Sequence, residues 1–131
     1  MFPVGYFGMN DEEATFSSVK KEILDFRNKR NWEQYHKPKN LSMAIGTEAG
    51  ELMEHFLWDD NEEAIEKLND SQRLEEVKEE LGDILIFSFL MAECLGEDVS
   101  DIMLNKIKKN EGKYPVEKSK GKSKKYTELG D

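Results

Sequence analysis

Apolar residues recur every three or four positions along most of this chain, which is the spacing of amphipathic helices. A first helix is expected from about Glu12 to Lys29, capped by Asn10 or Asp11. Its apolar stripe consists of Phe16, Val19, Ile23 and Phe26. The pattern stops at residues 31–39, where Pro38 disfavours helix at Lys37, so this segment is expected to be a connection.

Helical periodicity resumes after the connection and continues almost to the end of the chain. The expected helices cover residues 40–58, with Asn40 as the cap, 61–68, 71–95 and about 98–113. Gly96 is expected to end the third long helix. Because few positions alternate as in strands, we predict an all-α fold similar to a four-helix bundle. We expect one helical domain over residues 1–115 and a tail over 116–131, whose Lys, Ser and Gly content alone is typical of disorder.

Composition narrows the classes of function. The chain has 131 residues and a formal net charge of −9, which suits one acidic domain. Residues 1–100 carry 23 acidic and 10 basic side chains, whereas residues 101–131 carry 5 acidic and 9 basic ones. Such an acidic body argues against binding a nucleic-acid polymer, since that affinity comes largely from neutralising phosphates. It does not exclude a small phosphate ligand held through metal ions.

The chain has one cysteine and a short N-terminal segment without targeting features. Cys94 lies in an apolar run, so we expect it to be buried and inert, and an intrachain disulfide is excluded. That run carries Glu93 and is too short to cross a membrane, which takes about 20 apolar residues. Residues 1–10 show no basic segment followed by an apolar one. We therefore expect a cytoplasmic protein that has no membrane partner.

Two of the expected helices each carry a pair of acids at i, i+3 on or beside the apolar side. Glu48 falls inside the apolar stripe of the helix over 40–58, and Glu51 falls at its edge. Glu80 and Asp83 precede the apolar half of the helix over 71–95. Carboxylates on the core side of a helix are costly unless something compensates their charge. If the two helices face each other, the four carboxylates converge and require cations.

The chemistry of these four side chains favours Mg²⁺ or Mn²⁺, which prefer hard oxygen ligands. A ferritin-like di-iron site fails by residue count, because it needs Glu-x-x-His on two helices. That spacing occurs once, at Glu33 and His36, within the connection. His55 is expected to support or pack beside the acids rather than to bind a metal. A chance cluster of solvated acids is the alternative that spacing alone leaves open.

The same residues resemble a known family. The runs GTEAGELMEHFLW at 46–58 and EELGD at 79–83 resemble the ExxE…ExxD signature of the MazG-like all-α nucleoside triphosphate pyrophosphohydrolases. The segment RNWEQYHKPKNL at 30–41 is similar to the one before this signature in dCTP pyrophosphatases. Residues 106–116, with a Tyr-Pro pair, and 125–129 resemble their C-terminal region. The resemblance extends from about Phe16 to Leu129.

The resemblance implies a set of functional residues. Glu48, Glu51, Glu80 and Asp83 would be the metal-binding and catalytic acids. Trp32, His36 and Trp58 would line the base pocket, with Phe87 where related enzymes carry Tyr. Lys106 and Asn110 would lie near the phosphates and the sugar, beside Tyr114. Thr47 stands where wider members of the family often carry a second acid, so the general base stays open, with Glu51 as our choice.

The implied enzyme hydrolyses a deoxynucleoside triphosphate to the monophosphate and pyrophosphate with Mg²⁺, and Mn²⁺ is a substitute. It would remove unwanted nucleotides, with dCTP or modified dCTP as the favoured substrate. The same chemistry on dUTP, dITP or oxidised nucleotides is one alternative. A non-catalytic helical interaction module is another. The lean apolar content, 37% of residues, favours an oligomer, and the resemblance implies a homotetramer or homodimer.

Overall fold

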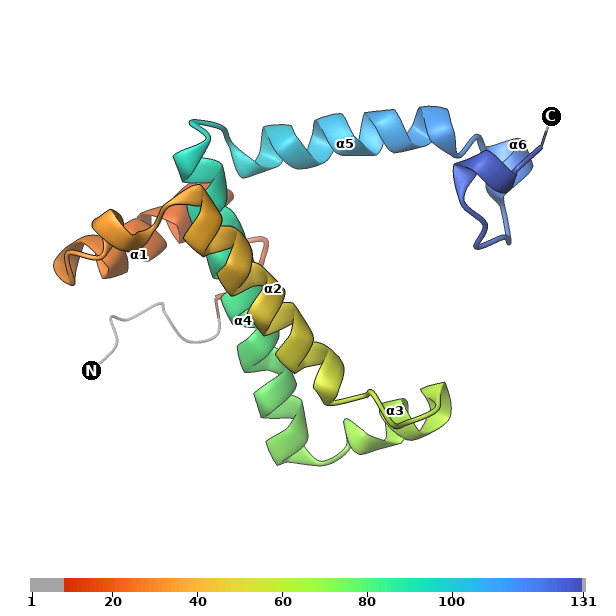
Figure 1. The fold of residues 1–131 in the computed structure, drawn as a ribbon, viewed down its shortest axis with the longest axis horizontal. Coiled ribbons are helices and arrows are strands. Elements are labelled where there is room, and N and C mark those ends of the chain that lie inside the picture. Colours follow the sequence, from red (N-terminus) through yellow and green to blue (C-terminus); the bar gives the residue numbers. More distant parts are fainter. Residues whose placement is uncertain (1–8, 131) are drawn as a thin grey trace. The chain divides into compact units, whose positions relative to one another are not determined.

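The computed structural model describes residues 9–130, and this part of the chain is helical without a strand (Figure 1). Residues 1–8, most of the N-terminal segment considered above, lie outside the described residues, as does residue 131. The chain divides into two compact units, one ending at Gly96 and one beginning at Glu97. Each unit is described by itself. The predicted all-α fold class is confirmed.

The first helix begins later than the sequence pattern predicted. α1 spans Phe16–Lys29, and its cap is Thr15, whose side chain accepts a hydrogen bond from the backbone of Ser18. The backbone amide of Thr15 in turn donates to the side-chain oxygen of Ser18, which completes a capping box. Asn10 does act as a cap, but of an isolated turn, because its side chain accepts from the backbone amides of residues 12 and 13. The predicted start at Glu12 was therefore wrong.

The connection after α1 is confirmed and contains one short 3-10 turn, η1, at Glu33–Tyr35. α2 then spans Pro38–Glu54, beginning two residues earlier than predicted and ending four residues earlier. Proline suits the first position of a helix because no partner is needed there for the missing N–H. The predicted cap, Asn40, lies inside the helix, and its side chain donates to the carbonyl of Tyr35.

The remaining helices agree closely with the predicted ones. α3 spans Asn61–Lys67 and α4 spans Ser71–Cys94, each capped at its start by an aspartate side chain, Asp60 and Asp70. Gly96 has a φ of 68°, a left-handed conformation that favours glycine, and it ends α4 as expected.

Helices α2 and α4 pack against each other in opposite directions, joined by α3, and α1 lies against α4 (Figure 1). The core of this unit is small. Its buried apolar residues are Ile23, Leu41, Phe89, Leu90 and Ala92. α1 is further attached to α4 by an edge-to-face contact of Phe16 with Phe89 and by a 3.4 Å ion pair of Lys20 with Glu93.

The prediction that Cys94 is buried was wrong, because the structure exposes it. The last turn of α4 extends past the buried residues Phe89, Leu90 and Ala92, and Cys94 is the final residue of the helix. Its Sγ lies 3.0 Å from the carbonyl oxygen of His36 and donates to it. The thiol therefore contacts the connection between α1 and α2 instead of the core.

Much of the apolar surface of α4 is exposed in the single chain. The exposed fractions of Leu81 and Leu85 are 46% and 52%, so the apolar surface of the helix is not fully covered by the rest of the chain. The first half of the helix is more polar, and its Glu75 and Glu79 are exposed. Among residues 9–130, no helix is long and apolar enough to cross a membrane.

The second unit contains α5 at Val99–Lys113, α6 at Val116–Ser119 and the 3-10 turn η2 at Tyr126–Glu128. α5 has the predicted extent. Short helical turns form in the segment whose composition alone is typical of disorder. The ring of Tyr126 contacts Tyr114 edge-to-face at 6.2 Å, and the Nζ of Lys113 lies 4.9 Å from its centroid, so the segment folds back onto the end of α5.

We expect Leu41→Ala to lower the free energy of unfolding by about 2–4 kcal/mol, because Leu41 is only 1% exposed and its loss leaves a cavity. Urea unfolding followed by circular dichroism measures the change. Lys39→Ala, at an exposed position of the same helix, is the control and should change stability by less than about 0.5 kcal/mol. Equal effects of the two substitutions would contradict the assignment of the core.

Candidate active site

The turn that ends α1 fixes the position of Trp32. Arg30 caps the helix, and Asn31 follows with a φ of 54°, a left-handed conformation that asparagine tolerates. The amide of Trp32 donates to the carbonyl of Arg27, and the amide of Asn31 donates to that of Asn28, which is the Schellman pattern. The indole of Trp32 then packs edge-to-face on Phe26. The local backbone therefore directs this tryptophan back towards α1.

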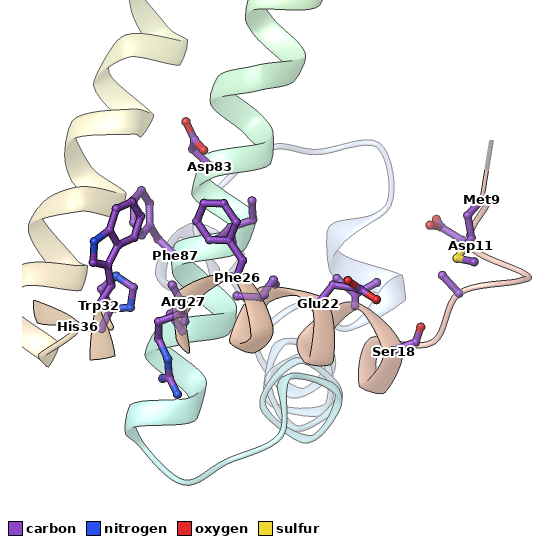
Figure 2. A pocket seen from close by; sticks show the side chains of 15 residues that line it. Met9, Asp11, Ser18, Glu22, Phe26, Arg27, Trp32, His36, Asp83 and Phe87 are labelled. Atoms are coloured by element: carbon purple, nitrogen blue, oxygen red, sulfur yellow. The ribbon is translucent and has the colours of Figure 1, made fainter. Parts of the chain in front are cut away.

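A pocket of about 740 Å³ lies between α1, the connection and α4, and it also borders residues 9–14 (Figure 2). Its volume is in the range of pockets that bind small organic molecules. Four of the predicted site residues line it: Trp32, His36, Asp83 and Phe87. The rest of its lining is mainly apolar, and it includes Ile23, Phe26, Ile86 and Leu90.

His36 enters this pocket with an unsatisfied polar atom. Its Nδ1 is buried and has no hydrogen-bond partner among the described residues. Burial, and to a lesser extent the charge of Arg27, lower the pKa of His36 below its usual value. The ring is therefore neutral at pH 7, with one nitrogen that donates and one that accepts. Such a ring can bind the polar edge of a ligand in the pocket.

Arg27 is a pocket residue that the sequence analysis missed. It is 8% exposed, and its Nε donates to the side-chain oxygen of Asn28 at 3.0 Å. The carboxylate of Glu33 lies 3.8 Å from its guanidinium. A signal was present, because Arg27 follows Ile23 by four residues and so continues the apolar stripe of α1. A charged residue in such a stripe indicates a buried polar contact.

The four predicted acids share one electrostatic environment on the packed faces of α2 and α4. The pKa of Glu48 is raised, first by burial and then by the charge of Glu51. Asp83, a hydrogen bond with Glu51, and Glu80 raise it further. Glu48 and Glu80 are half-buried, whereas Glu51 and Asp83 are exposed. Members of both i, i+3 pairs therefore raise the pKa of one carboxylate, that of Glu48, as expected if the helices face each other.

These acids fit a hard divalent cation by their chemistry, but they are not drawn together into a coordination shell. Among residues 9–130, no three His, Cys, Asp or Glu side chains are close enough to hold a metal ion. The raised pKa of Glu48 shows that negative charge is concentrated here, and a cation would relieve it. Carboxylate oxygens on four side chains are a donor set that Mg²⁺ and Mn²⁺ accept.

His55 contacts the acidic group directly, as the sequence analysis expected of a supporting residue. The residue caps the C-terminus of α2, and its Nε2 contacts Oε2 of Glu80. Its backbone carbonyl accepts a hydrogen bond from the guanidinium of Arg73. Spacing along the sequence did not predict either contact, because each one joins α2 to α4.

Trp58 is not part of the pocket in the single chain. It follows α2 and is 90% exposed, and it is absent from the lining formed by α1, the connection and α4. The side chain of the neighbouring Asp59, by contrast, is only 4% exposed and forms an ion pair with Lys67. The predicted role of Trp58 at the base therefore stays a prediction.

The other three predicted substrate residues belong to the second unit. Lys106 and Asn110 lie one turn apart on α5, and Tyr114 caps the end of that helix. Tyr114 packs on Tyr126, as described above. Their contacts with a substrate stay predictions.

Comparisons with known proteins identify the family of this chain. The MazG-like family model matches residues 43–129. dCTP pyrophosphatase 1 of Bos taurus is 36% identical over 117 residues, which are 89% of this chain and 69% of that protein. The Homo sapiens protein of the same name is 35% identical over 118 residues, with the same two shares.

Among solved structures, the crystal structure of a pyrophosphatase from Archaeoglobus fulgidus matches with a TM-score of 0.72 and 32% identity. The match covers 82% of this chain and 98% of that one. The region matched by the family model includes all four acids, most of α2 and the whole of α4. The chain belongs to the MazG-like family.

Proposed function

We propose that this protein hydrolyses deoxynucleoside triphosphates to the monophosphate and pyrophosphate with the help of Mg²⁺. The observation that carries the proposal is the position of Asp83. It lines the aromatic pocket, and it also belongs to the acidic group around Glu48. A site that binds an aromatic base beside carboxylates suited to a divalent cation is the site that such a reaction requires. The pyrophosphatase names of the relatives support the same conclusion.

The pocket supports recognition of the nucleoside. Trp32 and Phe87 offer ring faces or edges for the base and sugar, and His36 offers a neutral ring nitrogen. We propose dCTP or a modified dCTP as the favoured substrate, in keeping with the names of the relatives. dUTP, dITP or oxidised nucleotides are the alternatives, and a comparison of rates on each triphosphate distinguishes them.

The acids support the chemistry. When bound, Mg²⁺ would neutralise charge on the leaving pyrophosphate and lower the pKa of a bound water. Glu48, Glu51, Glu80 and Asp83 would hold the ions. Glu51 is exposed to solvent and shares a hydrogen bond with Glu48, which is one of the causes that raise the pKa of Glu48. We therefore keep Glu51 as the group that accepts the proton of the attacking water.

The exposed apolar surfaces support assembly into a homotetramer or homodimer. In the first unit, Leu81, Leu85 and Ile86 of α4 are 41–52% exposed. In the second unit, Leu104 and Ile107 of α5 are more than half exposed. Surfaces of this kind are typical of subunit interfaces. The cytoplasm stays the compartment we expect for such an enzyme.

The acidic group can be tested with Glu48→Gln. Removing one carboxylate from the site should lower the rate of pyrophosphate release from dCTP by about 100-fold or more at saturating Mg²⁺. Circular dichroism should show an intact fold. Glu79→Gln, an exposed acid next to Glu80, is the matched control and should retain the wild-type rate. A fully active Glu48→Gln enzyme would remove Glu48 from the site.

The pocket can be tested with Trp32→Ala. Loss of a stacking surface should raise KM for dCTP by about 10–100-fold, since stacking on an aromatic ring contributes about 1–3 kcal/mol per base. Tyr35→Ala is the control, because Tyr35 lies in the same connection, is 60% exposed and does not line the pocket. Steady-state kinetics measure both. An unchanged KM in Trp32→Ala would exclude this pocket as the base site.

The assembly can be tested by light scattering. We expect a mass of two or four times the 15.2 kDa chain at micromolar concentrations. Leu85→Glu should shift the mass towards one chain, because it places a charge in the exposed apolar surface of α4. Lys78→Gln, at an exposed polar position of the same helix, lowers the net charge by the same one unit and is the control. A wild-type monomer would refute the assembly.

A further inference from the structure

His55 joins the two helices that carry the acids, and it does so at two points. Its ring nitrogen Nε2 contacts Oε2 of Glu80, and its carbonyl oxygen accepts a hydrogen bond from Nη1 of Arg73. Both partners lie on α4, whereas His55 caps the end of α2. Arg73 and Glu80 are seven residues apart, which places them on one face of α4. His55 therefore has a fixed place opposite that face.

The backbone contact explains how His55 is held. The carbonyls in the last turn of a helix lack partners within the helix. In α2, the guanidinium of Arg73 satisfies the carbonyl of His55. The amide of His55 still bonds within α2, to the carbonyl of Leu52 at 3.3 Å. The ring therefore extends from a backbone that is fixed on both sides.

The ring contact is well shielded. The side chains of His55 and Glu80 are 17% and 21% exposed, so water competes weakly for their hydrogen bond. A carboxylate can accept hydrogen bonds through both of its oxygens. A donor that holds Oε2 also sets the direction of the other oxygen, Oε1. The contact thus limits the orientations that Glu80 can adopt.

Orientation matters for Glu80 because of its neighbours. Its charge acts on Glu48, together with the charges of Glu51 and Asp83. Without restraint, repulsion would turn these carboxylates away from one another and towards water. In metal sites, carboxylate ligands are commonly hydrogen-bonded by a further group that orients them.

We infer that His55 is a positioning residue, whose Nε2–H orients the carboxylate of Glu80 for divalent cations and whose backbone is held in place by Arg73. This inference rests on the function proposed above. The required tautomer carries its proton on Nε2. In this tautomer Nε2 donates to Glu80 and is not available to bind the cation. The contribution of His55 is to metal affinity rather than to the base pocket.

The test compares His55→Leu with His55→Gln. Leucine keeps the apolar bulk without a donor, and the amide of glutamine restores an N–H at a similar reach. Calorimetric titration with Mg²⁺ in the absence of nucleotide should show about 10–100-fold weaker binding in His55→Leu. The Mg²⁺ concentration for half-maximal activity should rise by the same factor. KM for dCTP at saturating Mg²⁺ should stay unchanged, and His55→Gln should recover most of the affinity.

Lys67→Met is the matched control for loss of a structural contact. It breaks the pair of Lys67 with Asp59 in the segment that joins α2 to α4, away from the acids. It should lower the melting temperature without changing Mg²⁺ affinity. If His55→Leu does not fold, Arg73→Met provides the same test, because it removes the anchor of His55 and should weaken Mg²⁺ binding in the same direction.

The outcomes separate this inference from the proposed function. Wild-type Mg²⁺ affinity in a folded His55→Leu variant would overturn the role of His55 and leave the proposed function intact. Equal losses of affinity in His55→Leu and Lys67→Met would also overturn it, since general loosening would then explain both. A wild-type protein that neither binds Mg²⁺ nor releases pyrophosphate from any deoxynucleoside triphosphate would overturn both proposals.

Discussion

Repulsion among carboxylates is the interaction on which the rest of this structure depends. The packing of α2 on α4 creates the core of the first unit, and the same packing brings two pairs of acids to one place. The pKa of Glu48 is raised first by burial and then by the charges of the neighbouring acids, because a proton relieves both costs. The ring of His55 offers a second form of relief at Glu80. The net charge of −9 therefore has two parts, a solvated one and one concentrated between helices.

The pocket between α1, the connection and α4 depends on a different feature, the turn that ends α1. A left-handed asparagine, Asn31, reverses the chain and returns Trp32 to the helix it has just left. His36 is attached to the far end of α4 through its carbonyl and the thiol of Cys94. The buried charge of Arg27 is stabilised because its side chain donates to Asn28 and lies near the carboxylate of Glu33. The connection is thus tied at several points, although it contains little regular structure.

The helices and both pairs of acids could be predicted from the sequence, because these features depend on local periodicity. The start of α1 was misplaced because Asn10 and Thr15 are both good caps, and only the capping box with Ser18 decides between them. The burial of Cys94 was predicted wrongly because composition does not show where a helix extends beyond the helices packed against it. The contacts of His55 could not be predicted from the sequence, for a related reason. They depend on the register of α2 against α4, which local periodicity does not specify.

Asp83 borders the pocket and also contributes to the acidic group, so the two regions are not independent. Under the proposed function, a cation that draws in this side chain changes the wall against which the nucleoside rests. Equilibrium linkage then makes the effect reciprocal: the factor by which the cation strengthens nucleotide binding equals the factor by which the nucleotide strengthens cation binding. Neither ligand has a single intrinsic affinity for this protein. Each affinity is defined only at a stated concentration of the other.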